Sequence, residues 1–220
     1  MGTGQQDCDL PTRGSGPIVA FDFDGTLTVR DSFNAFLAWR TPPPRLAREL
    51  LGLIPAALTY LVNRDRERLK TATVARFLAG VPVEALQTDA SAFCGELWPE
   101  LMRPDALAVW RDWGDRGAHR VIVTASPEIL VAPFAARLGA DELIGTRLKL
   151  DGEGRVVGAF LSPNCRAAEK VVRLQQRFGP TVRLAAAYGD SSGDVEMLAL
   201  ADEPGYRVFR QRPRRRPQSA

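Results

Sequence analysis

The sequence has one histidine, His119, and three cysteines among its 220 residues. A single histidine excludes His-rich metal sites and every mechanism that needs two imidazoles. The cysteines are odd in number and far apart, which excludes a zinc knuckle and a disulfide framework. No arginine lies six positions after a cysteine, so the Cys-x5-Arg motif is also absent.

The excess of positive charge is small and confined to the C-terminal end. Lys and Arg total 29 against 26 Asp and Glu, which gives a net charge of +3. Six arginines lie between Arg207 and Arg216, and without them the net charge becomes −3. A slightly acidic body argues against a general nucleic-acid-binding protein. The polar, glycine-rich N-terminus has no apolar core of a signal peptide, so we expect a cytoplasmic protein.

Apolar periodicity divides the chain into segments of different character. We predict a flexible leader over residues 1–16 and a flexible basic tail over 211–220. The run Ile18–Asp24 is apolar and ends in acid, which is typical of a buried parallel strand. From Asp31 to Leu101 the patterns are helical. We therefore expect a core formed by residues 17–30 and 104–210, with an all-helical cap over 31–103 inserted after the first strand.

Strands and helices alternate after Pro104, which indicates an α/β fold with a Rossmann-like parallel sheet. A hairpin interrupts the alternation in the second half of the chain. The predicted elements are strands over Arg120–Thr124 and Val182–Tyr188, helices over Pro127–Leu138, around Lys170 and over Asp194–Ala201, and the hairpin over Leu148–Phe160.

Polar residues close each predicted strand, and in parallel sheets such strand ends meet at one edge. They are Asp22 and Asp24, then Thr124 and Ser126, then Asp190 and Asp194. Four carboxylates beside Lys170 would repel one another unless a cation lies among them. Carboxylate oxygens without histidine or cysteine favour Mg²⁺. Such a site could accept a phosphate, with one carboxylate attacking phosphorus and another handling the proton of the leaving oxygen.

These residues form four ordered motifs, Asp22-Phe-Asp24-Gly-Thr26, Thr124, Lys170 and Gly189-Asp190-Ser-Ser-Gly-Asp194. Together they resemble the motifs of the haloacid dehalogenase superfamily of phosphohydrolases. The helical segment after the first motif is similar to the C1 cap of the phosphoserine-phosphatase-like branch. Four further runs are similar to bacterial subfamily IB hydrolases, which include a phosphatidylglycerophosphatase: Asp31-Ser-Phe, Val123-Thr-Ala-Ser126, Asn164-Cys-Arg and Glu169-Lys170.

The resemblance implies a role for each motif residue. Asp22 is expected to form an aspartyl-phosphate, while Asp24 protonates the leaving group and later deprotonates the attacking water. Thr124, Ser126 and Lys170 are expected to bind the phosphoryl group. The implied Mg²⁺ site consists of Asp22, Asp24 through its carbonyl, Asp190, and Asp194 acting through water or Lys170. The implied activity is Mg²⁺-dependent hydrolysis of a phosphate monoester.

Asp31 has two interpretations that stay open. It stands nine positions after Asp22, where phosphoserine phosphatases carry a glutamate that contacts the substrate ammonium. Its shorter side chain can equally cap a helix that begins at Ser32. A role in substrate specificity is therefore one of two expectations for this residue.

The run Leu50–Val62 is almost uninterruptedly apolar, yet it is too short to span a bilayer of about 30 Å. We expect it to form the buried core of the cap, and the alternative is a cap surface that touches lipid. The arginine-rich tail would add roughly 1 kcal/mol per residue on an anionic membrane, although we favour a solvated tail.

We therefore expect a phosphatase whose first candidate substrate is a lipid phosphate such as phosphatidylglycerophosphate, ahead of a soluble phosphorylated small molecule. Peripheral contact with the inner face of the membrane is compatible with the sequence, and no specific nucleic acid or obligate protein partner is expected. Three alternatives stay open. They are a phosphatase of a soluble metabolite such as phosphoserine, a phosphotransferase or mutase, and a non-catalytic binder of anionic lipid or RNA through Arg207–Arg216.

Overall fold

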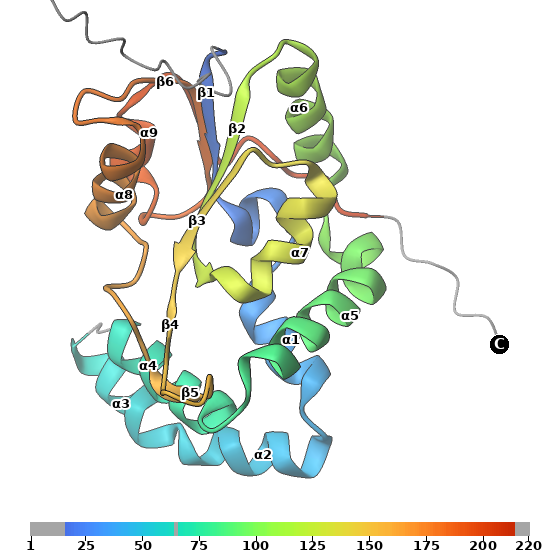
Figure 1. Ribbon diagram of the computed structural model, residues 1–220, viewed down its shortest axis with the longest axis vertical. Coiled ribbons are helices and arrows are strands. Elements are labelled where there is room, and N and C mark those ends of the chain that lie inside the picture. Colours follow the sequence, from blue (N-terminus) through green and yellow to red (C-terminus); the bar gives the residue numbers. More distant parts are fainter. Residues whose placement is uncertain (1–15, 64–65, 214–220) are drawn as a thin grey trace, which may run out of the picture.

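The computed structural model describes residues 16–63 and 66–213, and a five-stranded parallel sheet forms its centre (Figure 1). The strands lie in the order β3-β2-β1-β6-β7, so the first strand of the chain is central. Because all neighbouring strands are parallel, their carboxyl ends meet at one edge. The strands are β1 (Ile18–Phe21), β2 (His119–Pro127), β3 (Glu142–Thr146), β6 (Leu184–Gly189) and β7 (Ala201–Tyr206).

Alternate residues of β1 face two separate hydrophobic cores, as the two-residue period of a strand requires. Val19 and Phe21 pack with helices α6 (Pro104–Asp115) and α7 (Glu128–Leu138). Ala20 packs on the other face with α8 (Ala168–Phe178) and α9 (Val195–Leu198). Figure 1 shows these helix pairs on opposite sides of the sheet. The predicted Rossmann-like core is confirmed.

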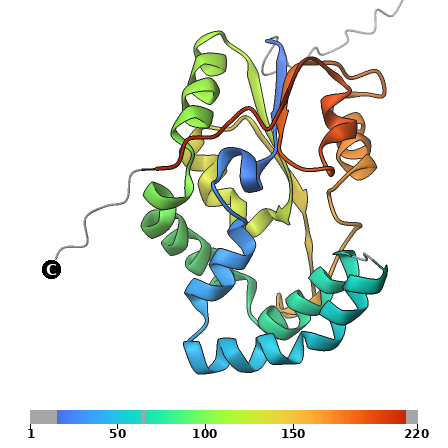
Figure 2. The ribbon, with the colours of Figure 1, turned by 180° about the vertical axis from the view of Figure 1, so that it is seen from behind.

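A cap covers the carboxyl edge of the sheet (Figures 1 and 2). An antiparallel hairpin from the second half of the chain, β4 (Leu148–Leu150) and β5 (Val156–Phe160), packs against helix α4 (Arg66–Leu78). Gly158 permits this close approach, because a Cβ there would lie 2.9 Å from the Cα of Ala75. The cap helices are α1 (Ser32–Arg40), α2 (Pro43–Gly52), α3 (Ile54–Asn63), α4 (Arg66–Leu78) and α5 (Val83–Leu101). We retain the division of the chain at residues 31 and 103 as a proposal.

An aromatic cluster joins the cap to the core. Phe134 of α7 lies at its centre, with its ring centroid 5.4 Å from that of Phe23 in the turn after β1. On the cap side its ring lies 6.0 Å from Phe93 and 5.9 Å from Trp98, both on α5. These separations are within the range of favourable aromatic pairs. The cluster therefore couples the position of α5 to the turn that carries the first motif.

Two strands differ from the sequence-based expectation. β3 is not among the predicted strands, and β7 begins at Ala201, where a helix from Asp194 was predicted. That prediction is wrong at its end, because α9 stops at Leu198. β7 lacks a clear apolar pattern because it is an edge strand, where Pro204 and exposed carboxylates are tolerated. The predicted leader up to residue 15 and the tail from residue 214 lie outside the described residues.

The apolar run Leu50–Val62 lies on the surface of the cap. Helix α3 contains no buried residue, and only Leu53 of the whole run is buried. The expectation that this run forms the buried core of the cap is therefore wrong. Helices α2 and α3, which carry this run, form the lower edge of the molecule (Figures 1 and 2). Several of its large hydrophobic side chains are exposed.

The aromatic cluster predicts the stability of one core variant. Phe134 is fully buried, so Phe134→Ala should lower the free energy of unfolding by about 3–5 kcal/mol through lost burial and a cavity. Urea denaturation followed by tryptophan fluorescence measures this change. Phe134→Leu is the matched control and should lose clearly less. A loss below about 1 kcal/mol for the alanine variant would contradict the proposed role of the cluster.

Candidate active site

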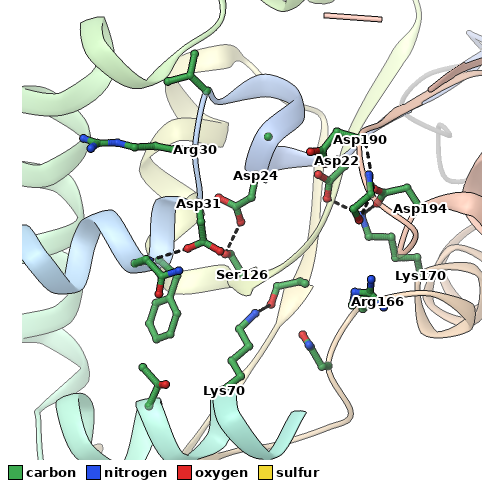
Figure 3. Close-up of a pocket in the computed structure, with 18 of the residues that line it drawn as sticks. Asp22, Asp24, Arg30, Asp31, Lys70, Ser126, Arg166, Lys170, Asp190 and Asp194 are labelled. Atoms are coloured by element: carbon green, nitrogen blue, oxygen red, sulfur yellow. Dashed lines mark hydrogen bonds and ion pairs between the residues drawn. The ribbon is translucent and has the colours of Figure 1, made fainter. Parts of the chain in front are cut away.

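Seven of the eight predicted site residues line one cleft of about 530 Å³ between the sheet edge and the cap (Figure 3). Thr124 is the exception, because its side chain is fully buried and its Oγ1 accepts a hydrogen bond from the Ser126 amide at 3.0 Å. The sheet supplies one wall of the cleft, and α1 and α4 supply the other. The seven residues are Asp22, Asp24, Asp31, Ser126, Lys170, Asp190 and Asp194.

A tight turn after β1 brings the first motif against the loop after β6. Gly25 lies in the left-handed region of backbone conformation, with φ at +83°. A Cβ at this position would lie 2.3 Å from Oδ2 of Asp190. Glycine is therefore required twice here, for the backbone conformation and for the close approach of the Asp190 carboxylate.

Lys170 is the central cation of the site. Its side chain is 1% exposed, and its Nζ donates to Asp22 Oδ1 at 2.6 Å and to Asp194 Oδ1 at 2.7 Å. The third proton of the ammonium reaches the Val123 carbonyl at 2.7 Å. Burial alone would lower the pKa of Lys170, but the two carboxylates outweigh it and raise that pKa above its ordinary value. Lys170 thus links α8 to the ends of β1 and β2 and to the loop after β6.

The pKa values of the carboxylates around Lys170 are shifted in different directions. Burial is the main reason why the pKa of Asp22 rises to about 7, with the charge of Asp194 adding to it against the opposing pull of Lys170. Burial and the charge of Asp194 also raise the pKa of Asp190. Asp194 behaves oppositely. Although burial would raise its pKa, Lys170 and hydrogen bonds from Ser191 lower it. The site therefore carries more negative charge than one lysine can stabilise.

This excess of negative charge fits a divalent cation. Asp22, Asp190 and Asp194 each offer one carboxylate oxygen, and these oxygens lie within 4.8 Å of one another. The donor set contains oxygen only, which suits Mg²⁺ better than zinc. A cation there would also favour the ionised form of Asp22, whose pKa is otherwise raised.

Asp24 occupies a separate place between the core and the cap. Its Oδ1 accepts a hydrogen bond from the Ser32 amide at 2.6 Å, and its Oδ2 accepts one from Ser126 Oγ at 2.5 Å. Figure 3 shows this carboxylate turned toward Ser126 and away from the carboxylates around Lys170. The hydroxyl of Ser126, which the sequence assigns to phosphate, therefore holds Asp24 in the structure.

Asp31 acts as the N-cap of α1. Its side chain accepts a hydrogen bond from the Asn34 amide at 2.7 Å, as the capping interpretation requires. The same residue lines the cleft, so the cap does not remove it from reach of a ligand. The structure therefore shows Asp31 as the N-cap of α1. A role of Asp31 in substrate specificity stays a proposal.

Sequence reasoning missed the cations that the cap and the loops bring to the cleft. Lys70 of α4 donates to the Ala125 carbonyl, and burial lowers the pKa of its ammonium group. Arg166 donates to Ser192 Oγ at 2.9 Å, and Arg103 Nε donates to the Gly25 and Thr28 carbonyls at 3.2 and 3.1 Å. The chain has only three lysines, and two of them line this cleft. That scarcity was the one signal in the sequence that could have singled out Lys70.

Cys165 does not provide a second nucleophile. Its side chain is fully buried beneath the cleft. Burial raises the pKa of its thiol to about 11, so the thiolate is scarce at neutral pH.

Comparison with known proteins places this site in a family. The family model of haloacid dehalogenase-like hydrolases matches residues 19–199. Protein CicA of Caulobacter vibrioides is 59% identical over 196 residues, which cover 89% of this chain and 88% of that protein. A phosphoserine phosphatase of Halobacterium salinarum is 28% identical, covering 84% and 82%. A histidinol-phosphatase of Neisseria meningitidis is 24% identical, covering 85% and 88%.

Solved structures share the fold. A protein of unknown function from Bordetella pertussis superposes with a TM-score of 0.71 at 25% identity, covering 86% of this chain and 88% of that one. A phosphoserine phosphatase determined as a phospho-aspartyl intermediate analogue gives a TM-score of 0.55 at 19% identity, covering 86% and 85%. The second likeness concerns the fold alone.

The raised pKa of Asp22 predicts a pH dependence of stability in the metal-free protein. Its folded value of about 7 exceeds the ordinary value of 3.8, so the folded state binds more protons in that window. The free energy of unfolding of the wild type, minus that of Asp22→Asn, should therefore fall as pH rises from 3.8 to about 7. Urea unfolding with EDTA at several pH values measures the difference. A difference that rises with pH would show that the pKa of Asp22 is lowered.

Proposed function

The chain belongs to the haloacid dehalogenase-like hydrolases and is a phosphatase enzyme, and from this premise we propose that it hydrolyses phosphate monoesters through a phosphoryl group carried on Asp22. The observation that supports this proposal most strongly is the buried contact of Lys170 with Asp22 and Asp194 at the floor of the cleft. A buried carboxylate fixed by a buried cation, and open to a cleft, suits a nucleophile held ready for attack.

The proposed reaction has two steps that return the enzyme to its starting state. A carboxylate oxygen of Asp22 bonds to phosphorus, and the bond from phosphorus to the leaving oxygen breaks as Asp24 gives that oxygen a proton. Asp24 then takes a proton from water, whose oxygen bonds to phosphorus. The acyl-phosphate bond breaks, phosphate leaves and Asp22 is restored. The hydrogen bonds from Ser32 and Ser126 hold Asp24 in position for both transfers.

Asp22, Asp190 and Asp194 are the residues that would hold Mg²⁺. The family resemblance adds the Asp24 carbonyl as a proposed further oxygen donor. When bound, Mg²⁺ would offset the negative charge of the phosphoryl oxygens and of the attacking carboxylate. Lys170 contributes a fixed positive charge beside Asp22 and keeps the carboxylate oriented.

Thr124, Ser126 and Lys170 are the proposed phosphate-binding residues. Ser126 and Lys170 line the cleft directly. The Thr124 hydroxyl accepts a hydrogen bond from the Ser126 amide. A phosphoryl oxygen would have to replace this hydroxyl as the acceptor of that hydrogen bond. The phosphate site would then combine the Ser126 amide and the released Thr124 hydroxyl with the fixed positive charge of Lys170. The Ser126 hydroxyl stays on Asp24.

The lining of the cleft favours a small polar leaving group. Away from the carboxylates, the walls carry Arg30, Lys70, Arg166 and Asn34, and the apolar side chains Val29, Phe33 and Leu69 are few. We therefore propose a polar phosphorylated small molecule as substrate, with Asp31 and Lys70 facing its leaving group. A lipid phosphate is the second candidate, which the exposed apolar run on α2 and α3 favours.

The role of Asp22 predicts a specific loss of activity. Asp22→Asn removes the nucleophile and should lower phosphate release at least about a thousandfold. The assay panel comprises phosphoserine, histidinol phosphate, phosphatidylglycerophosphate and an aryl phosphate, and product analysis separates hydrolysis from transfer to another acceptor. Asp202→Asn, at an exposed ion pair, is the matched control. Activity in Asp22→Asn close to that of the control would refute the assignment.

The proposed metal site predicts a change in Mg²⁺ requirement. Asp190→Asn removes one charged oxygen ligand, so the Mg²⁺ concentration for half-maximal activity should rise at least about tenfold. Activity titrations and calorimetry with Mg²⁺ alone measure this shift, again with Asp202→Asn as control. An unchanged Mg²⁺ dependence, or full activity in EDTA, would contradict the site.

A further inference from the structure

The end of α2 and helix α3 carry six exposed apolar side chains on the surface of the cap. They are 49% to 82% exposed, an unusual degree for side chains of this kind. They come from the end of α2 and from α3, which run along the lower edge of the molecule (Figures 1 and 2). We define the apolar ridge as Leu50, Leu51, Ile54, Leu58, Leu61 and Val62.

The ridge follows a helical repeat. Within α3, Ile54, Leu58 and Leu61 are spaced by four and three residues, which places their side chains on one face of that helix. Leu51 precedes them at the end of α2. No charged residue occurs from Leu50 to Asn63. Because α3 itself contains no buried residue, its apolar side chains contribute little to the core of the cap. These apolar side chains therefore face away from the described core of the cap.

The exposed charged side chains at the N-terminal border of the ridge are basic. Arg45 and Arg48 of α2 are exposed. The carboxylate of Glu49 is buried and paired with Arg48 and with Arg76 of α4, so it does not add an exposed negative charge. An aliphatic surface bordered by exposed arginines is complementary to an anionic lipid surface, whose headgroups attract arginine and whose acyl chains accept leucine.

We propose that the apolar ridge is a membrane-binding face that attaches the cap to an anionic lipid surface. The chemistry of the ridge distinguishes lipid from a protein partner. Protein interfaces concentrate aromatic anchors and hydrogen bonds at their centre, whereas the ridge is aliphatic throughout. Among the described residues, no helix is long and apolar enough to cross a membrane. In this proposal the ridge inserts into the headgroup region of one leaflet.

This attachment is independent of the proposed catalytic chemistry, because no ridge residue lines the cleft. Helix α4, which carries Lys70 at the cleft, is the direct neighbour of α3. Binding through the ridge thus brings the cap to the lipid surface and leaves the carboxylates and Lys170 untouched.

Vesicle sedimentation of the full chain tests the proposal. The vesicles are pure phosphatidylcholine, and phosphatidylcholine mixed with phosphatidylglycerol. We expect binding to the mixed vesicles, and Leu58→Ser/Leu61→Ser should lower the partition coefficient by about tenfold or more, because two apolar side chains no longer enter the lipid. The matched control Val172→Ser/Val208→Ser changes two exposed valines on the core and should bind like the wild type. All three proteins should hydrolyse a soluble aryl phosphate equally.

Three results would overturn the proposal. The first is no binding to either vesicle by the wild type. The second is binding that survives Leu58→Ser/Leu61→Ser but disappears when Arg214, Arg215 and Arg216 are replaced by glutamine, which would assign attachment to the tail. The third is a dimer in light scattering that Leu58→Ser/Leu61→Ser dissociates, which would make a second copy the occupant. A failure of the catalytic proposal would instead appear in the aryl phosphate assay.

Discussion

The ammonium group of Lys170 is the contact on which the site depends. It lies almost without exposure between the carboxylates of Asp22 and Asp194, and its remaining proton reaches the Val123 carbonyl. A buried charge is tolerated only when it is paired and fully hydrogen-bonded. These contacts therefore fix α8, the ends of β1 and β2, and the loop after β6 relative to one another. The positions of the other functional groups follow from that arrangement.

One cation does not neutralise the site, and this imbalance shapes its chemistry. Three carboxylates gather around a single buried lysine, and burial pushes the pKa of Asp22 to about 7. The site can reduce its charge by taking up a proton or a metal ion. A proton would neutralise the carboxylate that we propose as nucleophile and make it unreactive, whereas Mg²⁺ would leave it ionised. The same electrostatic constraint thus connects stability, metal dependence and activity.

The sequence predicts the core and much of the site because both depend on local patterns. Asp22, Asp190 and Asp194 follow apolar strands, and parallel topology brings strand ends together. Lys70 was missed because its position depends on how the cap folds over the sheet. The burial of Leu50–Val62 was misjudged because an apolar pattern predicts burial, whereas the position of α3 on the surface depends on how the cap helices pack. The hydroxyl of Ser126 was assigned to phosphate, since no pattern reveals its contact with Asp24.

The central claim is that Asp22 carries the phosphoryl group beside Lys170. A crystal structure of the protein with Mg²⁺ and beryllium fluoride, which mimics a phosphoryl group on a carboxylate, tests it most directly. We expect beryllium bonded to an oxygen of Asp22, a fluorine near Lys170, and Mg²⁺ held by Asp22, Asp190 and Asp194. Beryllium on another carboxylate, or Mg²⁺ away from these residues, would contradict it.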